Sequence, residues 1–146
     1  VCSSDLRFTK QQNYLDAAHK IARFIIDHRP SENDYVPYWD YDAPVTKETP
    51  RDVSAASVTA SAMIELSTMV PDGQKYLDYA EKILKSLSSD AYLAKVGDNQ
   101  GFILMHSVGS LPNGSEIDTP LNYADYYYLE ALKRFMDLKG ISYKNL

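Results

Sequence analysis

The stretch TPRDVSAASVTASAMIELSTM, Thr49 to Met69, decides the fold class of this chain. It opens with a helix-start signal, in which Thr49 is the expected N-cap, Pro50 takes the first helical position and Asp52 closes a capping box. The following residues are mostly Ala, Ser and aliphatic, and none is charged before Glu65. A helix that is apolar or small on most faces is surrounded by neighbours. We therefore expect an inner helix from Thr49 to Met69.

A second segment opens with the same Thr-Pro signal. TPLNYADYYYLEALKRF begins at Thr119 and carries a run of tyrosines followed by leucines. We expect an inner helix from Thr119 to Lys139 that is also buried on more than one side. The tyrosine hydroxyls are expected to reach polar partners at the end of the helix.

Two other segments resemble each other and are amphipathic. YLDAAHKIARFI (Tyr14 to Ile25) and YLDYAEKILKSL (Tyr76 to Leu87) agree at six of twelve positions, 62 residues apart. Both place apolar residues at helical spacing opposite charged ones, which is typical of surface helices. We expect outer helices over Thr9–His28 and Pro71–Ser88. The likeness is either an internal repeat or a coincidence between two ordinary helices.

Alternation of amphipathic and nearly apolar helices predicts an all-α toroid of helical hairpins, with an inner ring wrapped by an outer one. Four helices cannot close such a ring, and a bare apolar face calls for a partner. We therefore expect residues 7–139 to be a portion of a larger domain that self-associates through an exposed apolar edge or is covered by further helices. Residues 1–6 are expected to be a non-native or disordered leader, and residues 140–146 a C-terminal tail.

The bulk composition excludes several classes of protein. The 146 residues carry a net charge of -5, with a pI near 5.1, which argues against a nucleic-acid partner because phosphate binding requires a basic surface. No apolar run is long enough to cross a bilayer. The lone Cys2 cannot form an internal disulfide or a multi-thiolate metal site.

Two long connections, Arg29–Glu48 and Ser89–Asp118, lead into the starts of the two inner helices. Long connections of this kind are usually functional. If the inner helices are parallel, both connections lie at the same mouth, where helix N-termini present free N–H groups to an anion. The run GFILMHS, Gly101 to Ser107, is expected to be a strand or an extended piece of the second connection.

The candidate binding residues lie in these connections and on the last helix. In VPYWDYDAP, Trp39 either stacks on the apolar face of a sugar or fills the core, and its neighbours Asp40 and Asp42 make turns rather than catalyse. In HSVGS, the candidate ligand contacts are Ser107, Gly109 and Ser110, although Ser and Gly are also ordinary turn residues. His106 is expected to be structural. Tyr126 is a further candidate because of its expected place at the mouth.

Several blocks in order, VPYWDYDAP, PRDVSAAS (Pro50 to Ser57) and GFILMHSVGSLPNGSEIDTPLNYADYYYLEAL (Gly101 to Leu132), resemble the C-terminal part of glycoside hydrolase family 88, the unsaturated glucuronyl hydrolases. The resemblance runs from about Arg7 to Phe135. It implies a partial (α/α)6 barrel, about the last third of the full domain.

The resemblance also implies a chemistry. Enzymes of this family release 4,5-unsaturated uronic acid from lyase-generated glycosaminoglycan oligosaccharides, because an aspartate protonates the C4=C5 vinyl ether and water adds at C5. The family's catalytic aspartates lie upstream of the matching region. The resemblance therefore implies no catalytic residue in this chain, which alone would be inactive. It further implies no metal, cofactor, nucleic acid or membrane partner, and a location in the bacterial periplasm or cytoplasm.

Only the serine pair carries over from the family residue by residue. Ser107 and Ser110 match positions that contact the sugar next to the unsaturated one in members handling sulfated substrates. Those members follow the serines with a lysine where this chain has Pro112, which puts sulfate preference in doubt. The alternative hypothesis is a helical-repeat protein-interaction module without catalytic activity.

Overall fold

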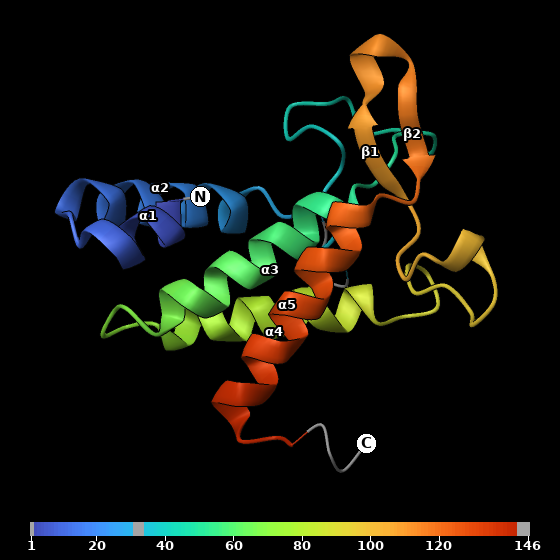
Figure 1. The fold of residues 1–146 in the computed structure, drawn as a ribbon. Coiled ribbons are helices and arrows are strands. Elements are labelled where there is room, and N and C mark those ends of the chain that lie inside the picture. Colours follow the sequence, from blue (N-terminus) through green and yellow to red (C-terminus); the bar gives the residue numbers. More distant parts are fainter. Residues whose placement is uncertain (1, 31–33, 143–146) are drawn as a thin grey trace.

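The computed structural model describes residues 2–30 and 34–142. Over this part of the chain, five α-helices are joined by loops and one small antiparallel sheet (Figure 1). The helices are α1 (Cys2–Thr9), α2 (Gln12–Asp27), α3 (Val53–Ser67), α4 (Gln74–Leu87) and α5 (Asn122–Lys139). The strands are β1 (Ser107–Ser110) and β2 (Ser115–Thr119), and two short 3-10 turns are η1 (Asn99–Gly101) and η2 (Leu111–Asn113).

Helix α3 is the centre of the molecule. It lies between α1 and α2 on one side and α5 on the other, and α4 packs along its length (Figure 1). Eleven of its fifteen residues are buried, and they lie on almost every face. The expectation of an inner helix here is confirmed, because Ala and Ser allow three neighbours to approach its backbone.

The start of α3 lies three residues later than expected. Asp52 is the N-cap, and its Oδ1 accepts hydrogen bonds from the Ser54 N–H at 2.9 Å and the Ser54 hydroxyl at 2.7 Å. The prediction that Thr49 caps this helix is wrong. The residues before Asp52 are extended instead, because the Trp39 N–H donates to the Pro50 carbonyl at 3.1 Å and Tyr38 pairs with Arg51 in a β-bridge.

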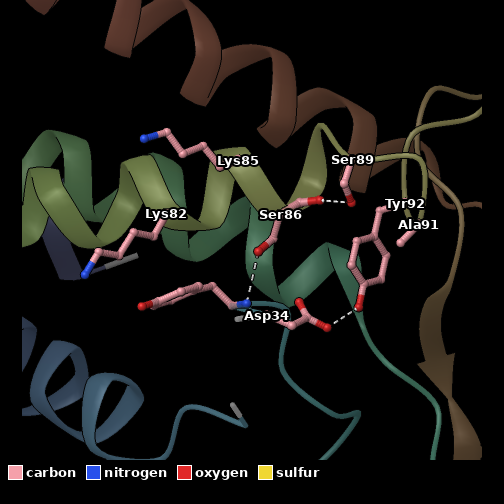
Figure 2. A pocket seen from close by; sticks show the side chains of 8 residues that line it. Asp34, Lys82, Lys85, Ser86, Ser89, Ala91 and Tyr92 are labelled. Carbon is pink, nitrogen blue, oxygen red and sulfur yellow. Dashed lines mark hydrogen bonds between the residues drawn. The ribbon is translucent and has the colours of Figure 1, made fainter. Parts of the chain in front are cut away.

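The outer helix α4 holds the first connection in place. It is amphipathic, as the sequence predicted, and buries its apolar face. The buried residues are Tyr76, Tyr79, Ala80, Ile83, Leu84 and Leu87. The Tyr35 N–H donates to Ser86 Oγ at 3.1 Å, and beyond the end of α4 the Tyr92 hydroxyl donates to Asp34 at 2.6 Å (Figure 2). The first connection is therefore fixed against the C-terminal end of α4.

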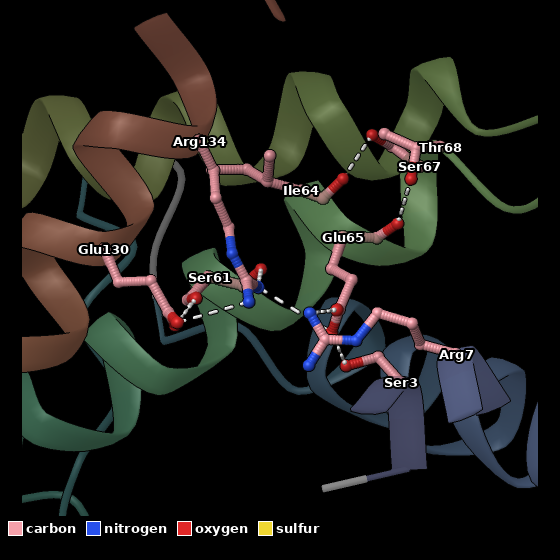
Figure 3. A network of polar contacts seen from close by, with 9 residues as sticks. All are labelled: Ser3, Arg7, Ser61, Ile64, Glu65, Ser67, Thr68, Glu130 and Arg134. Atoms are coloured by element: carbon pink, nitrogen blue, oxygen red, sulfur yellow. Dashed lines mark hydrogen bonds and ion pairs between the residues drawn. The ribbon is translucent and has the colours of Figure 1, made fainter. Parts of the chain in front are cut away.

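Helices α3 and α5 run parallel, as expected for inner helices. A polar network joins them at two levels (Figure 3). The Ser61 hydroxyl donates to Glu130, and Arg134 lies 3.7 Å from Glu65. Each of these pairs is separated by 69 residues. A constant separation along two helices means that they point in the same direction.

Helix α5 departs from expectation. Its buried residues are Ala124, Tyr128 and Ala131, all on the face toward α3 and α4. Tyr123, Tyr126 and Leu129 are 41%, 60% and 51% exposed. The prediction that this helix is buried on more than one side is wrong for the described residues, since no neighbour among them covers this second face. This exposed face of α5 is the apolar edge that an incomplete ring of helices was expected to have.

The second connection contains a hairpin beyond the strand or extended piece expected at Gly101 to Ser107, where Leu104 forms a bridge and Ser107 begins β1. Strands β1 and β2 form an antiparallel hairpin in which Val108 pairs with Ile117 and Ser110 with Ser115. The register shifts between Ser107 and Val108. Upstream, Leu93 pairs with Leu104 in an isolated bridge.

The two ends of the described chain are helical. Residues 2–6, expected to be a non-native or disordered leader, lie in α1, where Ser3 and Leu6 are buried. The Ser3 hydroxyl donates to Glu65 at 2.8 Å, so α1 joins the polar network of α3. Gly140, in the left-handed conformation, ends α5 as its C-cap, and positions 143–146 of the expected tail lie outside the described residues.

Candidate functional site

The two connections meet over the N-terminal ends of α3 and α5 (Figure 1). The Val53 N–H donates to the His106 carbonyl at 3.2 Å, and the Val108 N–H donates to Asp52 Oδ1 at 3.3 Å. The prediction that both connections lie at one opening is confirmed. We call this region, formed by residues 34–52 and 102–119, the mouth.

A pocket of about 540 Å³ lies in the wall of the mouth, a volume typical of small-molecule sites. It is lined by both connections, and its charged groups are of both signs. The lining residues are Lys47, Glu48, Thr49, Pro50, Arg51, Ala91, Tyr92, His106, Leu111, Ile117 and Asp118.

Arg51 supplies a rigidly held cation to this pocket. Its guanidinium donates to the Val36 carbonyl at 2.7 Å, lies 3.5 Å from Asp34 Oδ2 and sits 4.0 Å above the Tyr38 ring. The side chain is 23% exposed. A planar cation held on several sides is suited to recognise a carboxylate or sulfate. The sequence analysis read Arg51 only as part of a helix start and missed it.

Asp52 forms the acidic floor of the mouth. Burial raises the pKa of the Tyr123 hydroxyl, a hydrogen bond with Ser54 opposes this, and the charges of Asp52 and Glu116 add to the rise. Burial, and then the charge of Asp52, also raises the pKa of Tyr41. Both phenols therefore stay protonated well above neutral pH and remain able to donate hydrogen bonds. Asp52 Oδ1 caps α3 and accepts from the Val108 N–H, which fits a supporting role.

The structure brings the three HSVGS candidates together on β1 but gives them different surroundings. Ser107 is fully buried, and its Oγ has no hydrogen-bond partner among the described residues. Ser110 is half-buried, and its Oγ accepts from the Asn113 amide at 2.8 Å. A Cβ at Gly109 would clash with the side chain of Glu116, so any larger residue here would require that side chain to move.

Trp39 and Tyr126 lie outside the pocket lining. Trp39 is half-buried in the mouth, next to the β-bridge that holds the first connection. Tyr126 lies on the exposed edge of α5, with its ring edge-on to Tyr127 at 5.1 Å. Neither residue is brought into contact with the HSVGS segment by any interaction described here.

His106 stands at the rim of the pocket with a partner. Its Nδ1 lies 2.5 Å from Asp118 Oδ1, and its ring meets Tyr92 edge-on at 6.2 Å. His106 and Asp118 both have positive φ angles, 68° and 53°. Non-glycine residues rarely adopt this conformation, and strained backbone of this kind clusters at functional sites. The expectation that His106 is structural fits its Asp118 contact, which holds the base of the hairpin.

The described residues contain neither a membrane-spanning helix nor a cluster of metal-ligating side chains. No helix in them is both long and apolar enough to span a membrane. Residues 2–30 and 34–142 contain no group of three or more His, Cys, Asp or Glu side chains that could hold a metal ion.

Comparison with known proteins places the fold of this chain in the class of helical-hairpin barrels. No family model matches the chain. An unsaturated glucuronyl hydrolase of Formosa agariphila is 45% identical over 90% of this chain and 33% of its own length. An unsaturated chondroitin disaccharide hydrolase of Streptococcus pyogenes is 29% identical over 88% of this chain and 33% of its own.

Solved structures agree with the sequence comparison. A crystal structure described as an unsaturated glucuronyl hydrolase specific for heparin superposes with a TM-score of 0.91 and 56% identity, covering 96% of this chain and 38% of that one. A mutant of the Streptococcus agalactiae enzyme, complexed with dGlcA-GalNAc6S, superposes with a TM-score of 0.83 and 27% identity, covering 92% of this chain and 36% of that one.

These matches confirm the resemblance and the fold. The chain is homologous to the unsaturated glucuronyl hydrolases of glycoside hydrolase family 88, and its five helices form part of an (α/α)6 barrel. The chain spans about a third of the length of the curated relatives that it matches, which fits the expected C-terminal portion.

Proposed function

We propose that this chain forms part of a glycoside hydrolase that releases 4,5-unsaturated uronic acid from lyase-generated glycosaminoglycan oligosaccharides by hydration of the C4=C5 vinyl ether. The single observation that carries the proposal is the continuous match to unsaturated glucuronyl hydrolases over 90% of the chain. The mouth supports it, because a glycosidase substrate with a carboxylate needs cations and hydroxyls at one opening.

Within that enzyme, we assign residues 7–139 to the barrel and give this portion a binding role. The catalytic aspartates belong to the upstream part of the barrel, so the chain alone has no activity. Its contribution is to hold the sugar next to the unsaturated one. The partner is therefore an unsaturated uronate oligosaccharide that contacts both portions of the barrel.

Ser110 and Ser107 are the proposed hydroxyl contacts to that sugar, with Gly109 allowing close approach. The unpartnered Ser107 hydroxyl supports this role, since a buried hydroxyl without a partner costs about 1–3 kcal/mol and a ligand oxygen would relieve that cost. Pro112 lacks the charge of the family's lysine, so a sulfate on this sugar would need another cation. Lys47 and Arg51, which line the pocket of the mouth, are the candidate cations there.

Trp39 and Tyr126 are proposed as apolar surfaces beside the sugar rather than as direct hydrogen-bond partners. Trp39 belongs to the mouth segment, and its indole complements the apolar face of a pyranose. Tyr126 lies on the exposed edge of α5, where the rest of the barrel would adjoin it.

The test is a chimera. The chain replaces the matching third of the Formosa agariphila relative, and activity is followed as loss of the ultraviolet absorbance of the double bond. We expect hydrolysis by the chimera and none by the chain alone. A folded chimera without activity, while the parent relative is active, would overturn the proposal.

A second candidate function, the interaction module, is favoured by one observation. Between α2 and α3 lies an apolar groove of about 260 Å³ lined by Ala18, Ile21, Ala22, Ile25, Val58, Ala62, Met63 and Leu66, among others. Together with the exposed edge of α5, it would support self-association of the isolated chain. Sedimentation velocity distinguishes the two states: a monomer at high micromolar concentration would contradict self-association.

A further inference from the structure

A second pocket lies at the edge of the mouth, at the C-terminal end of α4. It measures about 550 Å³ and is lined by Asp34, Tyr35, Lys82, Lys85, Ser86, Ser89, Ala91 and Tyr92 (Figure 2). Nothing in the proposed reaction uses these residues. Its composition, two ammonium groups and two hydroxyls above aromatic rings, is that of a site for an acidic sugar.

The cationic side of the pocket belongs to one face of α4. Lys82, Lys85, Ser86 and Ser89 follow helical spacing, so they stand on the same side of the chain. The Lys82 Nζ lies 5.6 Å from the centre of the Tyr35 ring and has no carboxylate partner among the described residues. Lys85 is 73% exposed and pairs with Glu81 at 2.9 Å. Both cations are therefore accessible from solvent.

The acidic member of the pocket is neutralised from within. Asp34 Oδ2 accepts from the Tyr92 hydroxyl at 2.6 Å and lies 3.5 Å from Arg51, while Oδ1 accepts from the Val36 N–H at 3.0 Å. Burial and the bond to Asp34 both raise the pKa of Tyr92, so this hydroxyl stays a donor. The positive charge offered to a ligand therefore comes from Lys82 and from Lys85, which is shared with Glu81.

This pocket adjoins the pocket of the mouth and shares two lining residues with it. Ala91 and Tyr92 line both, and Arg51 reaches from the wall of the mouth to Asp34. A chain-like ligand leaving the mouth over Ala91 and Tyr92 would meet Lys82 and Lys85 next.

We propose that Lys82, Lys85, Ser86 and Ser89 form a distal subsite for an anionic sugar, which binds a carboxylate or sulfate of an oligosaccharide longer than a disaccharide. The inference rests on the proposed function, since the mouth is taken to hold the first sugars. It makes the protein prefer longer acidic chains. It also supplies the cationic contact that Pro112 does not provide, one step further along the ligand.

The experiment titrates the 146-residue chain at low salt with an unsaturated disaccharide and an unsaturated tetrasaccharide, both released from heparin by a lyase. We expect the tetrasaccharide to bind about three- to tenfold more tightly, the gain that two exposed charge contacts supply. The double variant Lys82→Gln/Lys85→Gln should lose this gain and leave disaccharide affinity unchanged. The gain should also shrink as salt screens the charges.

The matched control is Lys10→Gln/Lys20→Gln, which removes the same charge from exposed positions away from α4. It should retain the full gain. Glu81→Gln, which releases Lys85 from its ion pair, should increase the gain. Inorganic sulfate at matched ionic strength should compete with the tetrasaccharide more than with the disaccharide.

Equal affinity for the two ligands, or a gain that survives in the Lys82/Lys85 variant, would overturn the distal subsite and leave the mouth assignment intact. If the control variant loses the gain to the same extent, the gain reflects the overall charge of the protein, and the distal subsite is also overturned. A lysine-dependent tetrasaccharide signal without any disaccharide binding would retain the lysine site and contradict the proposed role of the mouth.

Discussion

Helix α3 carries a buried carboxylate near each end, and the two are satisfied in opposite ways. Asp52 is held by neutral donors, the Ser54 N–H and hydroxyl and the Val108 N–H, at the positive end of the helix dipole. Glu65 is held by cations, because Arg7 lies at 3.2 Å and Arg134 at 3.7 Å (Figure 3). The first arrangement joins the two connections of the mouth, and the second joins three helices at the far end.

The comparison teaches where charge is used for structure and where it is left for a ligand. At the far end every cation near Glu65 is paired with a carboxylate of the chain. At the mouth Asp52 needs no cation, and two cations line the pocket: Lys47, and Arg51, which is shared with Asp34. The predictions below test this division, starting with the change of largest expected effect.

Arg134→Ala should destabilise the chain most. The change removes a cation from Glu65, whose side chain is only 7% exposed, and a donor from the Ser61 carbonyl. Loss of one partner from a buried pair is strongly destabilising. Because Arg134 is 24% exposed and Arg7 remains, we expect a loss of about 2–3 kcal/mol in urea unfolding. Lys133→Ala, a neighbouring exposed position, should cost far less, and equal losses would contradict the account.

Asp52→Ala should cost about 1–2 kcal/mol, the usual cost of losing an N-cap. Asp52→Asn should cost less because the amide oxygen still accepts. The loop variant Asp42→Ala, at an exposed position, serves as the control and should leave the unfolding midpoint unchanged. If Asp52→Ala and Asp42→Ala behave alike, Asp52 does not hold the mouth together.

Most of the helices could be predicted from the sequence, and the features that could not be predicted have physical causes. Helices α2 and α4 follow from the periodicity of their apolar residues, and α3 follows from its run of small and apolar residues between Asp52 and Glu65. The cap of α3 could not be chosen locally, because both Thr49 and Asp52 are good N-caps. The contacts of Pro37 and Trp39 with Asp52 and Pro50 decide between them.

The hairpin was missed although a signal was present. Asn113-Gly114 between short runs of β-branched and small residues is a hairpin signal. Strand β2 is exposed along most of its length, so it shows no alternation of apolar and polar residues. Arg51 and the lysines of α4 escaped notice because their sites are assembled from segments far apart in the sequence.

Two fully buried serines offer a smaller test. Ser57 donates to the Val53 carbonyl at 2.8 Å, whereas Ser107 has no partner among the described residues. Ser57→Ala should cost about 1 kcal/mol, the net value of a hydrogen bond. Ser107→Ala should be neutral or stabilising, because it removes a buried hydroxyl without a partner. Urea unfolding of both variants checks this. A cost at Ser107 matching that at Ser57 would show that its hydroxyl is already satisfied without a ligand.

The smallest effect concerns alkaline pH. Burial raises the pKa of Tyr79 to about 12 from an ordinary 10.0, with smaller contributions from Tyr41 and Tyr35. Between these pH values the unfolded state loses its proton first, so the contribution of this group to stability is complete below pH 10.0 and declines as the pH rises toward 12. Tyr79→Phe should flatten the alkaline loss of stability measured by urea unfolding from pH 9.5 to 11.5. An unchanged slope would contradict the assignment.

The most direct test of the account is nuclear magnetic resonance of the 146-residue chain titrated with the unsaturated disaccharide. The account predicts amide shifts gathered in residues 36–52 and 104–119, at the starts of α3 and α5. Shifts confined to the groove between α2 and α3, or no saturable shifts in a folded chain, would contradict the claim that the two connections form one sugar-binding mouth.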